Sequence, residues 1–298
     1  MSTPLITFAI PYYKGREYLR RALRSLLEQD CPDWLAVVVD DRGGEDAEDI
    51  VIALDDSRVT FCRNSENLGL ARNWNKGIEL ASTELVTLFH ADDELEPWYV
   101  SEMIALMNRH PDAVAGHCRT VVVNEDGQPI FSLPDEVKKV IRPRTHEDIV
   151  TVGEDGLQSL MRGAWIFCPT LCFRKTKFPA NGFSERWRMV LDLDLTSRIL
   201  MSGGKLVGTP KVSYRYRRHG ANQTSLLTAE LTRFREEIAI LDEVAHQCEQ
   251  RGWSGAARTA RRKTIVRLHL CYQAVRSLAQ LRLPTMARML VAALRAQV

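Results

Sequence analysis

Short apolar runs alternate with amphipathic stretches along the first hundred residues. Four runs have the length and composition of buried strands, over residues 5–10, 35–39, 58–62 and 85–89. Leucines recur at helical spacing over residues 19–27, and a second helical stretch covers residues 70–80. This alternation predicts a mostly parallel sheet with helices on both faces.

The middle of the chain is less regular. Helical patterns cover residues 97–108 and 191–201, and strand-like patterns cover residues 114–123, 165–173 and 211–216. Residues 132–150 contain prolines and charges without clear periodicity. We interpret them as a loop over the functional edge of the sheet that closes on a ligand.

From Ala229 onward the pattern is helical only, with breaks at Gly252 and Pro284. One apolar stripe in this part is formed by Ile265, Leu268, Tyr272, Val275 and Leu278. The sequence therefore predicts an α/β domain over residues 1–225. A basic α-helical extension over residues 226–298 is expected to pack on this domain.

The composition fits a globular protein, with 45% apolar and 26% charged residues among 298. No window approaches the roughly 18 apolar residues of a membrane span. The polar start lacks the pattern of a signal peptide, so a cytoplasmic location is expected. Seven scattered cysteines show neither a disulfide framework nor the spacing of a zinc site.

The net charge of +2 is distributed unevenly. Residues 251–298 contain ten lysines and arginines and no acid, which leaves the first 250 residues with a net charge of −8. Such a basic helical segment predicts contact with an anionic membrane surface or with a second copy of the chain, or else a solvated helix face. Nucleic acid is not expected as a partner.

Polar side chains follow each predicted strand of the parallel sheet. These segments are Pro11-Tyr12-Tyr13, Asp40-Asp41, residues 64–69 and His90-Ala91-Asp92-Asp93. Ligands of open α/β sheets bind beyond the carboxyl ends of the strands, so the four segments are expected to converge. Neither a GxGxxG motif that opens a helix nor a P-loop is present, so a metal ion and basic side chains would have to hold phosphates. Asp92 and Asp93 carry the hard oxygen ligands that Mg²⁺ and Mn²⁺ prefer.

An ordered set of motifs resembles the family 2 glycosyltransferases, which are inverting enzymes of the GT-A fold. The motifs are IPYYKGREYLRRALRSLLEQ, VVVDDRGGED, ENLGLARNWNKGI, LFHADDEL, FSERWRMVLDLDLTSRI and YRYRRHGANQTS. They cover about residues 4–225. The resemblance implies a GT-A catalytic domain that uses a nucleotide-sugar donor, with UDP expected first, dTDP second and GDP third. A glycan or lipid-linked acceptor in cell-surface polysaccharide synthesis is expected by the same analogy.

The resemblance also implies which residues contact the nucleotide sugar. Pro11, Tyr12 and Tyr13 match the base pocket, Asp40 and Asp41 match contacts to the base or ribose, and Asn67, Gly69 and Arg72 match a loop beside the nucleotide. Asp92 and Asp93 match metal and ribose contacts. His219 and Arg218 match a late metal or diphosphate contact, so a Mn²⁺ or Mg²⁺ cofactor is implied.

Two positions depart from the family pattern or need a choice. His90 stands where the family usually has the first acid of a D-x-D motif, and it is either a metal ligand or a packing histidine. Asp192 matches the family's catalytic base, although Leu191 replaces the glutamate that usually precedes it. Asp192 and Asp194 point in different directions on a helix, so only one of them can face the acceptor, and we expect Asp192 to do so.

A second class of function stays open at this point. The basic C-terminal segment and the missing acid at His90 would also fit a non-catalytic protein that binds nucleotide sugars or nucleic acid. The retained Asp192 favours an enzyme.

Overall fold

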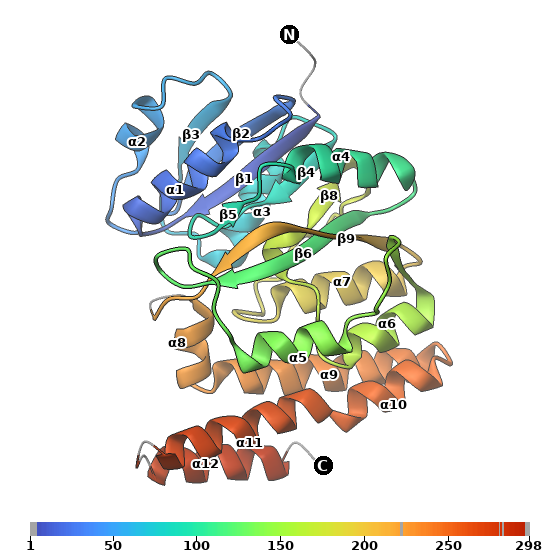
Figure 1. The fold of residues 1–298 in the computed structure, drawn as a ribbon. Coiled ribbons are helices and arrows are strands. Elements are labelled where there is room, and N and C mark those ends of the chain that lie inside the picture. The colour runs from blue at the N-terminus through green and yellow to red at the C-terminus, as the bar shows by residue number, and fades with distance from the viewer. Residues whose placement is uncertain (1–4, 221–222, 280, 282, 296–298) are drawn as a thin grey trace.

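A mixed β-sheet runs through the protein (Figure 1). The computed structural model describes residues 5–220, 223–279, 281 and 283–295. The polar start and the Ala221-Asn222 pair of the last motif therefore lie outside the described residues. Within them the sheet has nine strands in the order β3-β2-β1-β4-β8-β6-β9-β5, with β7 also paired to β9. The strands are β1 (Ile6–Tyr12), β2 (Trp34–Asp40), β3 (Val59–Arg63), β4 (Leu85–Leu88), β5 (Glu94–Leu95), β6 (Ala115–Val123), β7 (Ile149–Val152), β8 (Cys172–Arg174) and β9 (Lys205–Arg217).

Helices cover the sheet and continue beyond it. They are α1 (Arg16–Leu27), α2 (Glu48–Ile52), α3 (Leu70–Leu80), α4 (Tyr99–Arg109), α5 (Leu133–Ile141), α6 (Gly153–Met161), α7 (Leu191–Met201), α8 (Gln223–Ala229), α9 (Thr232–Gln250), α10 (Ser254–Arg262), α11 (Thr264–Ala279) and α12 (Leu283–Arg295).

The N-terminal half confirms the predicted alternation of strands and helices. β1 pairs in parallel with β2 and β4, and β2 pairs in parallel with β3. Almost every residue of β1, β2 and β4 is buried, which explains why their sequences read as continuous apolar runs. α3 lies close to β1 because Gly77 has no side chain, and a Cβ there would lie 2.9 Å from that of Ala9.

In the second half of the sheet, the end of β9 lies next to the turn that follows β4. β8 runs antiparallel to β4 and β6, whereas the long β9 runs parallel to β6. Register shifts at His117 and Arg119 mark an irregularity that accommodates Pro210 within β9. β9 ends at Arg217, beside Val123 and next to the turn after β4.

The predicted loop over residues 132–150 is wrong. α5 and β7 occupy most of this segment. The helix begins after Ser132, whose main-chain oxygen accepts from the N–H groups of Asp135 and Glu136, and Pro134 stands in the first turn. This start signal was missed because the apolar positions of so short a helix do not establish a period.

The strand predicted over residues 165–173 is also largely wrong. Only β8 is extended, and a 3-10 turn over Cys168–Thr170 precedes it. Pro169 lies in that turn and has no N–H to donate to a neighbouring strand, so the strand begins after it.

The first C-terminal helices share their core with the α/β part. Buried apolar side chains of α6 and α7 lie in one cluster with those of α9 and α10, including Leu157, Leu160, Leu195, Ile199, Phe234, Leu241, Val244, Ala245, Ala256 and Ala260. Glu154 at the start of α6 accepts a 2.6 Å hydrogen bond from the N–H of Gly255 in α10. The division at residue 225 stays a prediction, but this core is continuous across it.

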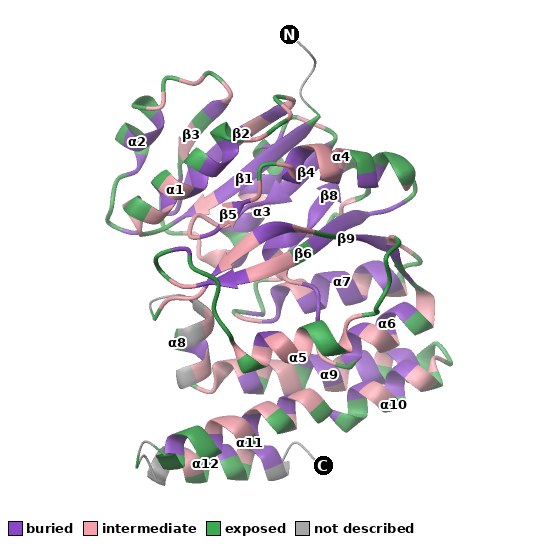
Figure 2. Cartoon of the chain, viewed as in Figure 1, coloured by how far each residue is buried: buried purple, intermediate pink, exposed green. Residues whose placement is uncertain are grey.

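α11 and α12 form the outermost pair of helices (Figure 2). The apolar stripe predicted on α11 packs on the rest of the protein only in part, since Ile265 lies beside Gly163 and Tyr272 is half-buried. Leu268, Val275 and Leu278 are exposed, whereas α11 packs through Val266, Leu270 and Ala274. Within the described residues, none of the helices combines the length and hydropathy that crossing a membrane requires.

Candidate active site

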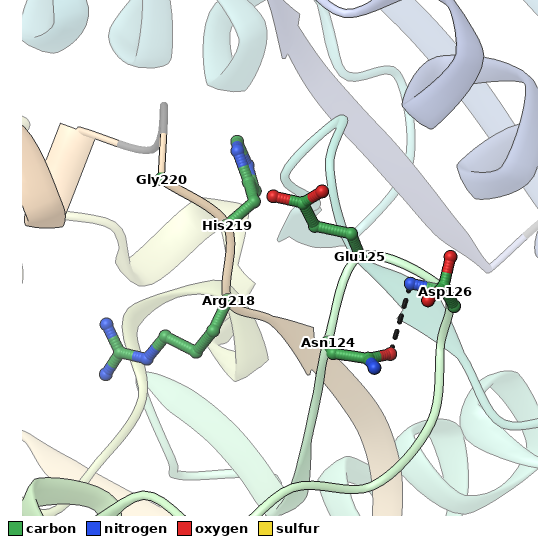
Figure 3. A pocket seen from close by; sticks show the side chains of 6 residues that line it. All are labelled: Asn124, Glu125, Asp126, Arg218, His219 and Gly220. Carbon is green, nitrogen blue, oxygen red and sulfur yellow. Dashed lines mark hydrogen bonds between the residues drawn. The ribbon is translucent and has the colours of Figure 1, made fainter.

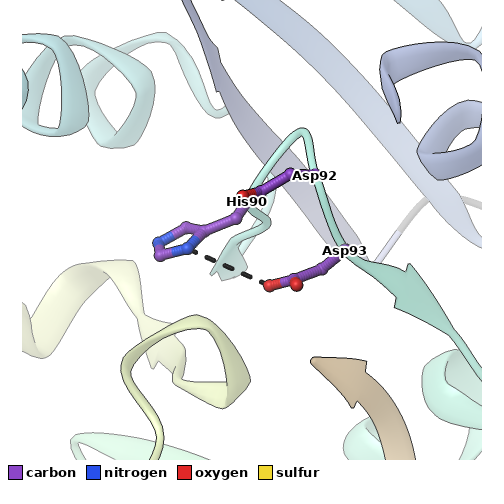
Figure 4. A group of neighbouring side chains, drawn as sticks. All are labelled: His90, Asp92 and Asp93. Carbon is purple, nitrogen blue, oxygen red and sulfur yellow. Dashed lines mark ion pairs between the residues drawn. The ribbon is translucent and has the colours of Figure 1, made fainter. Parts of the chain in front are cut away.

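The carboxyl ends of the parallel strands meet at one edge of the sheet, where the predicted polar residues gather. The register places Tyr12 beside Asp40 and Asp40 beside Arg63. The turn after β4 carries His90, Asp92 and Asp93 (Figure 4).

Asp40 is buried and supports the turn that follows β2. One of its carboxylate oxygens accepts from the main-chain N–H of Arg42 at 2.9 Å, and the other accepts from Nε of Arg63 at 3.0 Å. Arg42 has a φ of 55°, a left-handed conformation that side-chain-bearing residues adopt at a cost, and the hydrogen bond to Asp40 stabilises it.

Asp41 holds the loop between β3 and α3. Its carboxylate accepts from the N–H groups of Leu68 and Gly69 at 2.7 and 3.0 Å, and from the side-chain amide of Asn64 at 2.9 Å. Asn67 in the same loop donates to the main-chain oxygen of Asp41 at 3.0 Å. The structure thus brings Asp41, Asn67 and Gly69 together, and the hydrogen bonds of Asp41 hold the loop in its conformation.

The remaining nucleotide-side residues differ in exposure. Tyr12 is buried, and burial together with the charge of Glu45 raises its pKa to about 12. Tyr13 has 50% of its surface exposed, Pro11 is partly exposed, and Arg72 is exposed on the first turn of α3. Of the two tyrosines, Tyr13 is therefore the one that can stack on a base.

Asp92 and His219 form the central pair of the site. Nε2 of His219 lies 2.9 Å from Oδ2 of Asp92, so the end of β9 meets the turn after β4. Burial opposes ionisation of Asp92, but the hydrogen bond with His219 and the nearby His90 outweigh it, so the pKa of Asp92 lies below its usual value. Tyr18 of α1 stacks on the His219 ring at a centroid distance of 4.8 Å, which helps to fix the orientation of that ring.

Asp93 is fully buried and accepts hydrogen bonds at both oxygens. The N–H of Arg217 donates at 2.7 Å and the hydroxyl of Tyr214 at 2.9 Å. Burial and the charge of Asp92 raise the pKa of Asp93 well above its usual value. These contacts tie β9 to the turn after β4, so Asp93 positions the pair formed by Asp92 and His219.

The side chains at this turn can hold a divalent cation. Donor atoms of His90, Asp92 and Asp93 lie within 4.8 Å of one another, and Nε2 of His90 is buried without a hydrogen-bond partner among the described residues (Figure 4). Oδ2 of Asp92 and Nε2 of His219 lie 2.9 Å apart, so both atoms could face one ion if it replaced the hydrogen bond between them. A carboxylate and imidazole pair suits Mn²⁺ better than Mg²⁺, which prefers oxygen ligands only.

A pocket of about 490 Å³ opens beside His219 (Figure 3). It is lined by Asn124, Glu125, Asp126, Arg218, His219 and Gly220. Its volume is within the usual range for small-molecule sites. Arg218 lines it but is also held by Asp135 of α5 at 2.8 Å, so the predicted diphosphate contact is already oriented by a carboxylate.

The buried Arg217 joins the walls of this pocket. Its side chain donates to the main-chain oxygens of Asp92, Asn124 and Glu125 at 2.8 Å each and pairs with Glu94. The sequence shows it as one of several neighbouring arginines, and no pattern distinguishes its structural role.

Asp192 and Asp194 lie in the first turn of α7 and point to different surroundings, as predicted. Asp194 pairs with Arg198 at 2.8 Å. Asp192 lines a small cavity with Leu160, Ile166 and Leu171 among others, and burial raises the pKa of its carboxyl group. A raised pKa is typical of a carboxylate that acts as a base near neutral pH.

Lys138 of α5 is a candidate site residue that the sequence did not identify. Its ammonium lies 4.2 Å from the centre of the Phe167 ring. Burial lowers the pKa of Lys138, while the charges of Asp135 and Asp192 oppose that shift. The charge of Lys138 therefore interacts both with the base candidate and with the carboxylate that holds Arg218.

Glu236 of α9 is a second residue that sequence reasoning missed. Its carboxylate accepts from the N–H groups of Arg188 and Met189 at 3.0 and 2.7 Å, directly before α7. It therefore satisfies N–H groups at the helix end that carries Asp192. Only the tertiary structure brings these segments together.

Comparison with known proteins gives a family match and several relatives. The model of the family described as "Glycosyl transferase family 2" matches residues 7–162. An uncharacterized protein of Mycobacterium tuberculosis is 29% identical over 235 residues, which are 76% of this chain and 71% of that protein. The putative colanic acid biosynthesis glycosyl transferase WcaA of Escherichia coli is 34% identical over 35% of this chain and 38% of its own length. The GalNAc(5)-diNAcBac-PP-undecaprenol beta-1,3-glucosyltransferase of Campylobacter jejuni is 30% identical over 39% of this chain and 38% of its own length.

Solved structures show the same fold. S. aureus TarS 1-349 in complex with UDP-GlcNAc has a TM-score of 0.61 and 18% identity, covering 80% of this chain and 66% of that chain. The mannosyltransferase PcManGT from Pyrobaculum calidifontis, in complex with GDP-Man and Mn²⁺, has a TM-score of 0.61 and 16% identity, covering 100% of this chain and 88% of that one. The expected GT-A fold with C-terminal helices is thereby confirmed.

Proposed function

This chain belongs to glycosyl transferase family 2, and we propose that it transfers a sugar from a nucleotide-sugar donor to an acceptor hydroxyl with inversion at the anomeric carbon. The observation that carries this proposal is the pairing of Asp92 with His219 beside the pocket. Asp192 lines a separate small cavity and interacts electrostatically with Lys138. Relatives that act in polysaccharide and lipid-linked glycan synthesis support the reaction class.

Asp192 is the proposed general base. Its carboxylate takes the proton from the acceptor hydroxyl as that oxygen attacks the anomeric carbon, and the bond to the nucleoside diphosphate breaks on the opposite face. One carboxylate is enough for such a displacement. Burial raises the pKa of Asp192, which increases its basicity, while Lys138 keeps the ionised form accessible.

Asp92 and His219 are proposed to face the diphosphate of the donor. A Mn²⁺ or Mg²⁺ ion held there would supply positive charge to the leaving group. Arg218 adds a fixed cation on the same side of the pocket, oriented by Asp135. Asp93, Arg217 and Tyr18 position these groups.

The nucleotide and acceptor follow from analogy. We propose UDP as the nucleotide, with dTDP and GDP as alternatives. TarS, whose fold is similar, was solved in complex with UDP-GlcNAc. GDP is retained as an alternative because the similar structure of PcManGT contains GDP-Man. The acceptor is proposed to be a glycan or a lipid-linked glycan.

Thermal unfolding with UDP, dTDP, GDP and NAD, each with and without Mn²⁺, tests the donor site. A ligand at ~100 times its dissociation constant stabilises the folded state by about 2.7 kcal/mol. Stabilisation by one nucleoside diphosphate that increases with Mn²⁺ is the expected result. Failure of every nucleotide to stabilise the protein would contradict the proposal.

A non-catalytic nucleotide-sugar binder is the second candidate, favoured by His90 in place of the usual acid. Asp192→Asn separates the two functions. An enzyme would lose its turnover by roughly 10²- to 10⁴-fold and keep its nucleotide binding. Detectable turnover that is unchanged in this variant would remove Asp192 as the base, and binding without any turnover in the wild type would favour the binder.

A further inference from the structure

The outermost helices expose an apolar surface that the catalytic site does not use. On α11, Leu268, Val275 and Leu278 have 60%, 67% and 49% of their surface exposed. Together with the exposed Cys271 they follow one another at intervals of three or four residues, so they lie on one side of the helix. We call these four residues the outer stripe.

The outer stripe is separate from the face that packs α11 on the protein. The packed face consists of Val266, Leu270, Ala274 and Ser277, and Ser277 contacts Met289 of α12 at 3.8 Å. α11 is therefore apolar both on its packed face and on its outer face. α12 also exposes Leu290 and Val291, at 42% and 46%.

The segment that carries this surface has charges of one sign only. Residues 251–298 contain ten arginines and lysines and no acid. The inner cations of this segment are paired with acids of α9, as in the 2.7 Å contact between Lys263 and Asp242. Arg276 directly follows Val275 on α11 and Arg288 precedes Leu290 by two residues on α12, and both arginines are exposed.

We infer that the outer stripe of α11 and the exposed apolar residues of α12 dock on a bilayer surface that contains anionic lipid. Acyl chains would cover the leucine and valine side chains, while lipid phosphates would neutralise the arginines. A nucleic acid offers phosphates without an apolar phase. A symmetric contact with a second copy would bring arginines against arginines, with no acid in the segment to neutralise them. This inference does not depend on the proposed reaction.

Vesicle co-sedimentation tests the inference with the full chain. The protein is mixed with phosphatidylcholine vesicles and with vesicles that also contain phosphatidylglycerol, at low and at high salt. Binding should require the anionic lipid and weaken with salt, because exposed charges are screened over about 10 Å at 0.1 M and less at higher ionic strength. Equal binding to both vesicles, or none, would overturn the inference.

Variants on the exposed surface identify the contact residues. Arg276→Gln should lower the partition coefficient by roughly fivefold, since one arginine near an anionic surface contributes about that factor. Leu268→Glu combined with Val275→Glu should lower it further, and Ile52→Glu on α2 is the matched control because Ile52 is 71% exposed. Wild-type binding by the double variant would overturn the inference.

A fluorescent probe and a mass measurement separate lipid from self-association. Among the described cysteines, Cys271 is the exposed one, so a polarity-sensitive thiol probe reports on the outer stripe. Its emission should shift to the blue with anionic vesicles, and the Cys271→Ser variant supplies the background. A dimer in solution that the Leu268→Glu and Val275→Glu changes convert to a monomer, without vesicle binding by the wild type, would assign the surface to a second copy instead.

Discussion

Lys138 influences the ionisation of Asp192, the proposed base. Burial raises the pKa of the Asp192 carboxyl group, and the positive charge of Lys138 acts against that rise. Lys138→Met removes the charge but keeps most of the apolar chain. The pKa of Asp192 should therefore rise further. Because a base acts in its ionised form, the acid limb of the rate profile should move to higher pH.

The measurement is turnover against pH for the wild type and Lys138→Met. The rate should fall most on the acid side, by up to about tenfold for each pH unit below the new limb, and recover at higher pH. Lys139→Met is the control, because Lys139 is exposed and pairs with Glu136 at 2.6 Å. An acid limb that stays in place would show that Lys138 does not act on the base.

Asp41 gives a second prediction at the scale of one side chain. Its carboxylate accepts two main-chain N–H groups of the loop before α3. Asp41→Ala should leave these donors without their partner and reduce the free energy of unfolding by about 1 to 3 kcal/mol. Nucleotide affinity should fall as well, since Asn67 and Arg72 lie in or next to this loop. Denaturant unfolding and nucleotide titration measure both effects, and an unchanged midpoint would contradict this account.

The same residues show what the sequence could predict about the site. That Asp40 and Asp92 lie at one edge of the sheet could be predicted because strand ends carry positional information, and His219 was named from a motif; the roles of all three stay predictions. The sequence could not show that Asp41 and Asp93 use their oxygens on neighbouring main chain and side chains, because those partners depend on register between distant segments. Lys138 was missed for the same reason, since α5 and α7 are far apart in sequence.

At the scale of helices and strands, long periodic elements were predictable and short ones were not. The predicted helices over residues 70–80 and 191–201 agree with α3 and α7 at both ends. α5 was not predicted because the signal for its start lies within a charged stretch. The strand predicted over residues 165–173 is mostly absent because Pro169 lies in a 3-10 turn. Both wrong predictions therefore come from single residues that start or end an element, Ser132 and Pro134 at the start of α5 and Pro169 before β8.

The contact between α9 and the start of α7 yields a prediction at this scale. Glu236→Gln removes the negative charge of the group that accepts from the N–H groups of Arg188 and Met189, although the amide oxygen can still accept. Loss of a negative charge at a helix start should cost about 0.3 to 1 kcal/mol of stability. Turnover should fall more than nucleotide binding, because Asp192 lies in the first turn of α7.

Glu230→Gln is the matched control for this effect. Glu230 is exposed and lies 4.0 Å from Arg188, so its loss should change stability by less than about 0.5 kcal/mol. Equal effects of the two substitutions on unfolding and on turnover would argue against a special role for Glu236.

At the scale of the whole molecule, the question is whether the C-terminal helices can be removed. The sequence predicts a domain boundary between residues 225 and 226. In the structure, Phe234, Ile240, Leu241 and Val244 of α9 are buried in the same cluster as α6 and α7. Each such side chain contributes about 1.5 to 3 kcal/mol when buried, against a typical total stability of about 5 to 15 kcal/mol.

A chain that ends at residue 225 should therefore fail to fold, whereas one that ends at residue 281 should keep its cooperative unfolding. The second truncation removes α12 and leaves α9 and α10 in place, so it should lose part of the vesicle binding while retaining nucleotide-dependent stabilisation. Circular dichroism against temperature, with and without nucleotide and Mn²⁺, measures both chains. A well-folded chain of residues 1–225 would restore the predicted boundary, and it would mean that the core shared with α9 contributes little to the stability of the α/β part.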